Sequence, residues 1–272
     1  MSPKLRVGIV GCGAIGSSLA ENILKKFSKN ANLVSLYDID PLKSRQLSKK
    51  ISKNIIASTL TQLIAKSDLV VEAASAKVSY GIAKEALTLG KDVMVMSVGG
   101  LVGKLEPLKK LAVKNSARVY IPSGAICGID ALKAAKFDKI TKVTLTTKKS
   151  PKAFKGVKYI NERGIDLDRI RGEKVLFSGT AEKAVINFPQ NINVAAVLSL
   201  AGLGAKRTIV KIIASSFVTR NIHEIKIESN AGVINTRTEN VLHPANPKTS
   251  YLAVLSAVAT LSGILESVKI GT

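Results

Sequence analysis

The fold of this chain is decided by the stretch LRVGIVGCGAIG, residues 5–16. A short apolar run, Leu5–Val10, leads directly into the spacing Gly11-x-Gly13-x-x-Gly16, and a helical pattern follows. In such a turn the first glycine allows a tight bend, the second lets a pyrophosphate approach the backbone, and the third lets the helix pack on the strand. The start of the helix then directs N–H groups and a positive dipole end at the phosphates. The stretch therefore predicts a βαβ unit that binds a dinucleotide.

The residue that ends the second expected strand, Asp38, supports the same interpretation. A carboxylate about 20 residues after the third glycine accepts hydrogen bonds from ribose hydroxyls and repels a 2′-phosphate, which favours NAD over NADP. Lys43 and Arg45 lie just beyond and would tolerate a phosphate, so NADP stays an alternative. We expect the dinucleotide to contact Gly11, Gly13, Ala14, Ile15, Gly16, Asp38 and Ala73.

Glu72 precedes the small-residue turn Ala73-Ala74-Ser75, at the end of a later expected strand. The carboxyl ends of parallel strands beside a topological switch point line the cofactor cleft, so this turn is expected there. The Glu72 carboxylate is either part of that cleft or a structural group, and the sequence leaves both open.

The first half of the chain alternates short apolar runs with helical patterns. Leu69-Val70-Val71 and Val93–Met96 are continuously apolar, as expected of parallel strands covered on both faces by helices. This alternation predicts a doubly wound parallel sheet. Strands are expected at Leu5–Val10, Leu33–Asp38, Ile55–Ala57, Leu69–Glu72, Asp92–Met96 and Arg118–Ile121, and helices at Ile15–Phe27, Pro41–Ile51, Leu60–Lys66, Val78–Leu89 and Leu105–Asn115.

The pattern changes after Ser123-Gly124-Ala125. Residues 140–148 alternate polar and apolar side chains, which indicates an antiparallel strand with one solvated face. Residues 154–174 are polar without a strong period and are expected to form a long loop. Further helices are expected at Ala181–Phe188, Ile192–Leu203 and Ser250–Val268, and strands at Lys206–Ala214, His223–Glu228 and Gly232–Thr238.

These elements predict an α/β protein with two domains. Residues 1–125 are expected to form a Rossmann domain, a doubly wound parallel sheet that binds NAD(P). Residues 126–245 are expected to form an α+β domain with a mainly antiparallel sheet, which holds the substrate and the dimer contacts. Residues 246–272 are expected to form a C-terminal helix that packs back on the first domain.

The composition is that of a globular protein, with 46% hydrophobic and 22% charged residues among 272. A net charge of +22 raises the hypothesis of nucleic-acid binding. The excess lysines are spread along the chain and aromatic residues are few, so a solvated surface and no nucleic-acid partner are expected.

Cys12 and Cys127 are expected to be reduced thiols in the cytoplasm. No apolar segment approaches the length of a membrane span, and no metal-ligand motif occurs, so neither a membrane nor a metal is expected.

The chain contains two histidines, His223 and His243. An imidazole can accept or donate a proton near neutral pH, as the oxidation of an amine or alcohol requires. His223 lies where a loop meets a strand, and His243 lies in a loop with two prolines. A structural role is the alternative for either residue.

Several motifs, taken in their order, resemble the L-aspartate dehydrogenase family. They are Gly11–Gly16, Asp92–Gly99, Ser123–Asp130, Asn187–Ala195, Asn221–Ile225 and Asn246–Ser250. The resemblance implies an NAD(P)-dependent enzyme that oxidises L-aspartate to iminoaspartate, which feeds NAD biosynthesis or hydrolyses to oxaloacetate and ammonia. It implies that His223 is the catalytic acid/base and that Ala125 and Asn191 contact the cofactor, with Asn193 as the alternative to Asn191.

A dicarboxylate substrate requires cations or amide donors, and arginine can bind a carboxylate through two parallel hydrogen bonds. The candidate substrate ligands are Asn193, Arg220, Lys248 and Thr249. Plain surface charge is the alternative for Arg220, and capping of the last helix is the alternative for Thr249.

A homodimer formed through the sheet of the second domain is expected. Two other functional hypotheses stay open. One is another two-domain amino-acid dehydrogenase, such as a homoserine-type enzyme, and the other is a non-catalytic protein that senses NAD(H).

Overall fold

The computed structural model describes residues 3–189, 193–244 and 246–271, with Pro247 and Lys248 described without their side chains. The chain divides into two compact units. The first runs to Pro122 and includes Val254–Lys269, and the second comprises Ser123–Ala253. The last helix therefore begins in the second unit and continues in the first.

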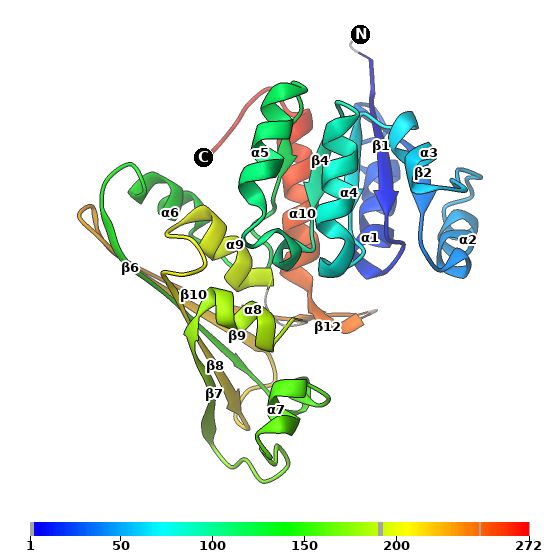
Figure 1. Ribbon diagram of the computed structural model, residues 1–272. Helices are drawn as coiled ribbons and strands as arrows, with labels where there is room; N and C mark the ends of the chain where they lie inside the picture. Colours follow the sequence, from blue (N-terminus) through cyan, green and yellow to red (C-terminus); the bar gives the residue numbers. More distant parts are fainter. Residues whose placement is uncertain (1–2, 190–192, 245, 272) are drawn as a thin grey trace. The chain divides into compact units, whose positions relative to one another are not determined.

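The first unit is built on a parallel five-stranded sheet with the order β2-β1-β3-β4-β5 (Figure 1). Its strands are β1 (Leu5–Val10), β2 (Ala31–Tyr37), β3 (Leu69–Glu72), β4 (Asp92–Val95) and β5 (Val119–Tyr120). Its helices are α1 (Ala14–Lys25), α2 (Pro41–Lys50), α3 (Leu60–Lys66), α4 (Ala76–Thr88), η1 (Val98–Leu101), α5 (Leu105–Lys114) and most of α10 (Tyr251–Leu265). Because β1 is followed by β2 on one side and by β3 on the other, the strand order reverses between β1 and β3.

Helices cover both faces of this sheet. Val7 and Ile9 of β1 belong to one apolar cluster with buried residues of α1 and α10. Gly8, which points to the opposite face, lies against Leu63 of α3. Since both faces are covered, β3 is buried at every residue. The predicted doubly wound parallel sheet is confirmed.

The prediction of a strand of this sheet at Ile55–Ala57 is wrong. The segment forms a single parallel bridge between Ile56 and Leu36, with two backbone hydrogen bonds to Leu36. Ile56 is exposed, whereas Ala57 is buried and Ile55 packs against the core, so only one side of this outer segment is covered. The sheet therefore has five strands where the sequence predicted six.

The second unit contains a mixed five-stranded sheet with the order β10-β9-β6-β8-β7. Its strands are β6 (Ile140–Lys149), β7 (Glu173–Thr180), β8 (Thr208–Ser215), β9 (Asn221–Ser229) and β10 (Gly232–Asn240). The short strands β11 (Leu242–His243) and β12 (Asn246–Ser250) form a separate pair. Only the pairing of β6 with β8 is parallel in the five-stranded sheet, so the predicted mainly antiparallel sheet is confirmed. The alternation in β6 indicated its solvation and could not reveal its parallel partner.

Helices of the second unit lie on one face of this sheet (Figure 1). They are α6 (Ile129–Ala135), α7 (Lys158–Glu162), α8 (Ala181–Asn187) and α9 (Asn193–Ala201), with the short η2 (Pro151–Phe154). Val143 and Leu145 of β6 and Ile225 of β9 pack against them in a single core. The side chain of Thr180 accepts a hydrogen bond from the Lys183 N–H at 3.4 Å and caps α8.

The prediction of a long loop at residues 154–174 is wrong in part. The segment includes α7 and reaches the start of β7, and neither element was predicted. Phe154, Ile160 and Leu167 are buried at intervals along it and attach it to the core of the second unit. These widely spaced anchors have no regular period, which is why the pattern indicated a loop.

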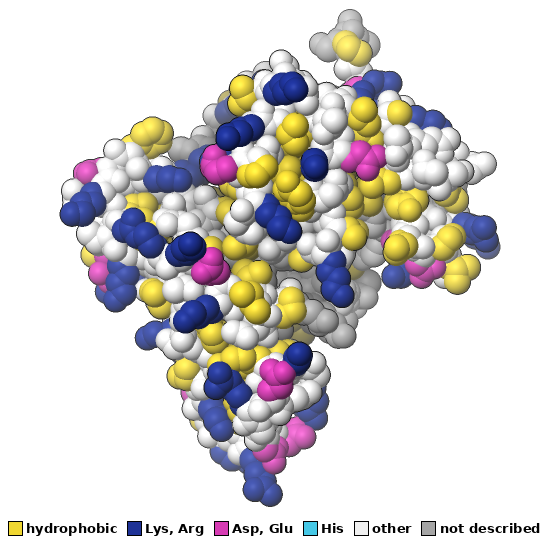
Figure 2. Space-filling model, in the orientation of Figure 1, with side chains coloured by type: hydrophobic (Ala, Val, Ile, Leu, Met, Phe, Trp, Pro, Cys, Tyr) yellow, Lys and Arg dark blue, Asp and Glu magenta, His cyan; other side chains and the backbone are white. Residues whose placement is uncertain are grey.

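Figure 2 shows lysine and arginine side chains scattered over the visible face, without one continuous basic patch. Cys12 and Cys127 are free thiols. No helix in the described parts of the chain is long and apolar enough to cross a membrane.

Candidate active site

The glycine loop after β1 is closely packed on its inner side and open on its outer side. Gly11 has a φ of +96°, and a Cβ placed there would lie 2.4 Å from the Ala73 carbonyl oxygen. A Cβ on Gly16 would lie 1.9 Å from the Gly11 carbonyl oxygen, so glycine is needed for α1 to approach β1. A Cβ on Gly13 would meet nothing within 4 Å. The loop therefore leaves room for a ligand beside Gly13.

The N-terminus of α1 adjoins this space. Ala14, Ile15 and Gly16 form the first helical turn, whose N–H groups have no carbonyl partner within the helix. Gly13 caps the helix without a side-chain hydrogen bond, and the first turn contains no acidic residue. These N–H groups and the helix dipole fit a phosphate group.

The Asp38 carboxylate lies at the carboxyl end of β2, beside the loop. Its Oδ2 accepts a hydrogen bond from the Cys12 N–H at 2.7 Å, and its Oδ1 accepts one from the Asp40 N–H at 2.9 Å. These bonds fix the carboxylate, and its oxygens retain lone pairs that can accept hydroxyl groups. Burial raises the pKa of the Cys12 thiol to about 12, so this thiol stays protonated and is not a nucleophile.

Glu72 connects two turns at the same edge of the sheet. Its Oε1 accepts a hydrogen bond from the Ala74 N–H at 2.8 Å, and its Oε2 accepts one from the Ser97 N–H at 2.9 Å. The side chain is fully buried, and burial raises its pKa. Glu72 therefore has the structural role that the sequence left open, since it holds the turns after β3 and β4. The neighbouring Ala73 is half-buried and donates its N–H to the Val10 carbonyl at 2.8 Å.

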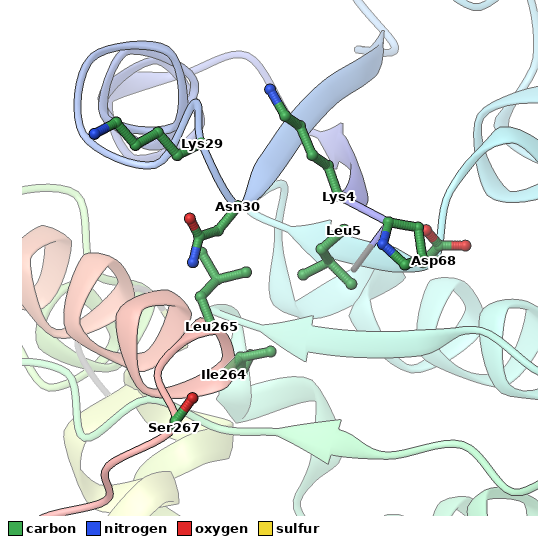
Figure 3. A pocket seen from close by; sticks show the side chains of 9 residues that line it. Lys4, Leu5, Lys29, Asn30, Asp68, Ile264, Leu265 and Ser267 are labelled. Carbon is green, nitrogen blue, oxygen red and sulfur yellow. The ribbon is translucent and has the colours of Figure 1, made fainter. Parts of the chain in front are cut away.

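A hollow of about 810 Å³ lies at the opposite edge of the first unit (Figure 3). It is lined by Leu5, Asn30 and Asp68, which stand at or just before the amino ends of β1, β2 and β3. Asp68 is held there by an ion pair with Arg6. Because ligands of doubly wound sheets bind at the carboxyl ends of the strands, this hollow is not the dinucleotide site.

In the second unit, His223 of β9 lies in a buried group of polar side chains. The imidazole is 3% exposed, and its Nδ1 is 3.0 Å from Thr147 Oγ1 on the neighbouring strand β6. Thr147 and Thr238 are the cross-strand partners of His223 on its two sides. The histidine therefore has a threonine beside it on each neighbouring strand.

Lys149 lies two residues beyond Thr147, at the last position of β6. It is buried, and burial lowers its pKa to about 8. Burial and the charge of Lys149 together lower the pKa of His223 to about 3. The His223 imidazole is therefore neutral near pH 7, whereas the Lys149 ammonium remains mostly protonated.

Two buried asparagines complete the group. The Asn240 Nδ2 donates a hydrogen bond to the Ala125 carbonyl at 3.0 Å, and Thr238 Oγ1 donates one to the same oxygen at 3.1 Å. The Asn221 Nδ2 donates to Ser250 Oγ at 3.3 Å. The side chains that we call the polar cluster are Thr147, Lys149, Asn221, His223, Thr238 and Asn240.

The polar cluster gathers at one end of the sheet of the second unit. Lys149 ends β6, Asn221 begins β9 and Asn240 ends β10. Sequence analysis identified only His223 of these residues. A signal existed for two others, because Thr147 and Lys149 continue the two-residue spacing of Val143 and Leu145, which face the core.

The other predicted site residues occupy varied positions. Ala125 is buried and held by the two hydrogen bonds to its carbonyl. Arg220 is exposed in the bend just before β9, and Asn193 is exposed at the first position of α9. Thr249 is half-buried in β12. Asn191 and the side chain of Lys248 lie outside the described residues.

The second histidine has different surroundings. His243 is buried in β11, and its ring lies edge to face with that of Tyr251, with the centroids 5.5 Å apart. Its described ring contact is thus an aromatic one, which fits a packing role. Of the two histidines, His223 is the one in the polar cluster.

A parallel sheet with a glycine loop that fits a phosphate at its carboxyl edge, and a mixed α+β unit with a buried neutral histidine, are typical of two-domain nicotinamide-dependent dehydrogenases. Comparison with known families agrees. Residues 11–122 match the model for the homoserine dehydrogenase NAD-binding domain, and residues 130–264 match that for the C-terminal domain of aspartate dehydrogenase.

The particular family follows from full-length relatives. The chain is 44% identical to an L-aspartate dehydrogenase of Methanosarcina barkeri and 45% identical to one of Methanosarcina mazei, over 98% of this chain and all of each relative. It also aligns with the crystal structure of an aspartate dehydrogenase from Thermotoga maritima, with a TM-score of 0.76 and 28% identity over 99% of this chain and 100% of that one. The chain belongs to the L-aspartate dehydrogenase family, which confirms the predicted resemblance.

Proposed function

We propose that this chain oxidises L-aspartate to iminoaspartate with NAD, and that His223 is the catalytic acid/base. The observation that carries the proposal is the buried, neutral imidazole of His223 beside Thr147 and Lys149. A neutral imidazole has a nitrogen lone pair that can accept a proton, whereas an imidazolium has none. The curated relatives named above are L-aspartate dehydrogenases, which supports the choice of substrate.

The reaction requires removal of a proton from the substrate ammonium group before the α-carbon gives up a hydride. A bound nicotinamide would accept that hydride. When His223 Nδ1 carries its proton and donates to Thr147 Oγ1, Nε2 presents the lone pair that accepts the substrate proton. The negative charge of a bound dicarboxylate stabilises the resulting imidazolium, because a nearby opposite charge favours the protonated form. Iminoaspartate then leaves for NAD biosynthesis or hydrolyses to oxaloacetate and ammonia.

The residues of the first unit fit a dinucleotide. Gly13 leaves open space beside the loop, the first turn of α1 offers N–H groups, and Asp38 presents a fixed carboxylate. We propose NAD as the preferred form because the Asp38 carboxylate repels a 2′-phosphate. NADP is the alternative form, and initial rates with L-aspartate and each of the two coenzymes would decide between them. Further proposed contacts are Ala73, Ala125 and Asn191 to the cofactor, and Asn193, Arg220, Lys248 and Thr249 to the substrate.

We also propose a homodimer formed through the helix-free face of the second sheet. Thr144 and Thr146 are half-buried on this face and line a hollow of about 270 Å³ with Lys226 and Asn235. Sheets can pack face to face, and a two-fold axis makes one face its own partner. Sedimentation equilibrium tests this, since a monomer at micromolar concentration would contradict it.

The free thiols of Cys12 and Cys127 fit a reducing compartment, and we propose the cytoplasm.

The function is tested by NADH absorbance at 340 nm in initial-rate assays. We expect formation of NADH with L-aspartate and none with L-homoserine. Formation with homoserine alone would indicate a homoserine-type enzyme. Tight NAD binding without turnover, left unchanged by His223→Ala, would indicate a nucleotide sensor.

A further inference from the structure

Three polar side chains of the edge strand β10 contact the loop that precedes α6. Thr236, Thr238 and Asn240 occupy alternate positions of the strand, so their side chains lie on one face. Thr236 Oγ1 donates a hydrogen bond to the Cys127 carbonyl at 3.4 Å. Thr238 Oγ1 and Asn240 Nδ2 both donate to the Ala125 carbonyl. Side chains of β10 therefore attach this loop to the sheet of the second unit.

The Ala125 carbonyl is held by the shorter of these bonds. Its oxygen accepts from Asn240 Nδ2 at 3.0 Å and from Thr238 Oγ1 at 3.1 Å, and a carbonyl oxygen has two lone pairs to offer. Ala125 and Asn240 are buried, and a buried polar group that loses its partner costs more than the bond itself contributes. The orientation of the peptide group that follows Ala125 is therefore fixed.

Both donors lie opposite residues of the strand that carries His223. Thr238 is the cross-strand partner of His223, and its Oγ1 is 3.5 Å from the His223 carbonyl oxygen. Asn240 is the partner of Asn221, and its Nδ2 is 3.4 Å from the Asn221 carbonyl oxygen. Directly opposite residues of an antiparallel pair have their Cβ atoms about 4.5–5.5 Å apart. Ala125 is thus joined to the strand of His223 through two short side chains.

We propose that Thr238 and Asn240 are positioning residues, which hold Ala125 against the nicotinamide end of the cofactor at a fixed place relative to His223. This inference rests on the proposed function, in which one substrate molecule loses a proton to His223 and a hydride to the cofactor. The two acceptors must reach neighbouring atoms of that substrate, so the part of the cofactor near His223 is its reacting end. A displacement of about 1 Å at such a site can cost about 100-fold in rate.

The test compares the binding of NADH with that of ADP-ribose, which lacks the nicotinamide. Thr238→Val removes the hydroxyl with little change of shape, whereas Thr238→Ser retains it. We expect Thr238→Val to weaken NADH binding by about fivefold in fluorescence titrations, since a buried hydrogen bond is lost. Its affinity for ADP-ribose, measured by calorimetry, should stay within about twofold of wild type, and Thr238→Ser should recover the affinity for NADH.

Thr236→Val is the matched control. It makes the same chemical change on the same face of β10, but Thr236 bonds the Cys127 carbonyl and not that of Ala125. Both affinities should therefore stay within about twofold of wild type. If Thr236→Val weakened NADH binding as much as Thr238→Val does, the effect would belong to the whole loop, and the proposal for Thr238 and Asn240 would be wrong.

Turnover gives a second readout. Thr238→Val should lower kcat for L-aspartate by about tenfold, because Ala125 is no longer held in its place relative to His223. Thr238→Ser should recover most of kcat. A loss of stability alone would reduce the fraction of active protein, and would not change the ratio of NADH affinity to ADP-ribose affinity.

An unchanged ratio of the two affinities in Thr238→Val would overturn the proposal, and so would an equal loss of both ligands. Should Thr238→Val fail to fold, Asn240→Ala replaces it, because it removes the other donor to the same carbonyl, and the same ratio decides. If the ratio changes but L-aspartate gives no NADH, the proposed function fails and the role of the two residues in cofactor binding stands. If L-aspartate is oxidised and the ratio is unchanged, the proposed function stands and the positioning role fails.

Discussion

The buried histidine should make the stability of this protein sensitive to mild acid. The folded-state pKa of His223 is about 3, whereas an unfolded histidine titrates near 6.5. Its folded pKa is therefore depressed, so the unfolded chain binds a proton below about pH 6.5 that the folded chain does not bind. The contribution of His223 to the free energy of unfolding is therefore fully present above about pH 6.5 and is lost as the pH falls toward the folded pKa.

The size of the loss follows from the same two pKa values. Each pH unit inside this window removes about 1.4 kcal/mol from the free energy of unfolding. Between pH 7 and pH 5 the window is about 1.5 units wide, so His223 should remove about 2 kcal/mol. His223→Gln keeps hydrogen-bonding capacity beside Thr147 but does not titrate, and this part of the acid sensitivity should disappear.

The assay is urea unfolding of wild type and His223→Gln at pH 7 and pH 5. We expect the difference in unfolding free energy between the two proteins to shift by about 2 kcal/mol in favour of the variant at pH 5. Thr147→Val is the matched control, because it removes the hydrogen bond but keeps the imidazole, and it should retain the wild-type pH dependence. A difference that stays constant between the two pH values would refute the inference that the buried imidazole is neutral.

Three further predictions concern activity and the glycine loop. His223→Ala should lower kcat/KM for L-aspartate by about 10²- to 10⁴-fold with NAD affinity unchanged, and steady-state kinetics with a separate NAD titration would expose a merely structural effect. Asp38→Ser should raise the ratio of kcat/KM with NADP to that with NAD by about tenfold or more, and an unchanged ratio would remove Asp38 from coenzyme choice. Gly13→Ala should leave thermal stability within about 0.5 kcal/mol but weaken NAD binding, because its Cβ meets no protein atom. Gly16→Ala should instead destabilise by about 1–3 kcal/mol, because its Cβ would overlap the Gly11 carbonyl, and equal melting curves for the two variants would contradict this contrast.

The prediction of the first unit succeeded because its signals are local. The spacing of Gly11, Gly13 and Gly16 specifies a turn whose steric demands lie within a few residues, and continuously apolar runs indicate strands covered on both faces. Prediction failed at Ile55–Ala57, where the same apolar pattern gave only a single bridge. Both backbone hydrogen bonds of this short segment to the sheet involve Leu36, so its pairing ends after one bridge.

In the second unit the local signals were weaker. The strand β7 was not predicted, and α7 was taken for part of a loop, because Phe154, Ile160 and Leu167 are buried without any regular spacing. The alternation of β6 identified a strand correctly but gave no information about its partners. Pairing with β8 in parallel and β9 in antiparallel depends on residues more than sixty positions away.

The sequence by itself determined the glycine loop after β1, the doubly wound sheet and the family, because these follow from local sterics, periodicity and ordered motifs. It also selected His223 through the family resemblance. Only the tertiary structure placed Thr147, Lys149 and Asn240 with that histidine, since cross-strand register brings them together from distant segments. Only the tertiary structure also decided that the imidazole is neutral beside a buried ammonium, because desolvation depends on what packs around a group and not on its neighbours in the chain.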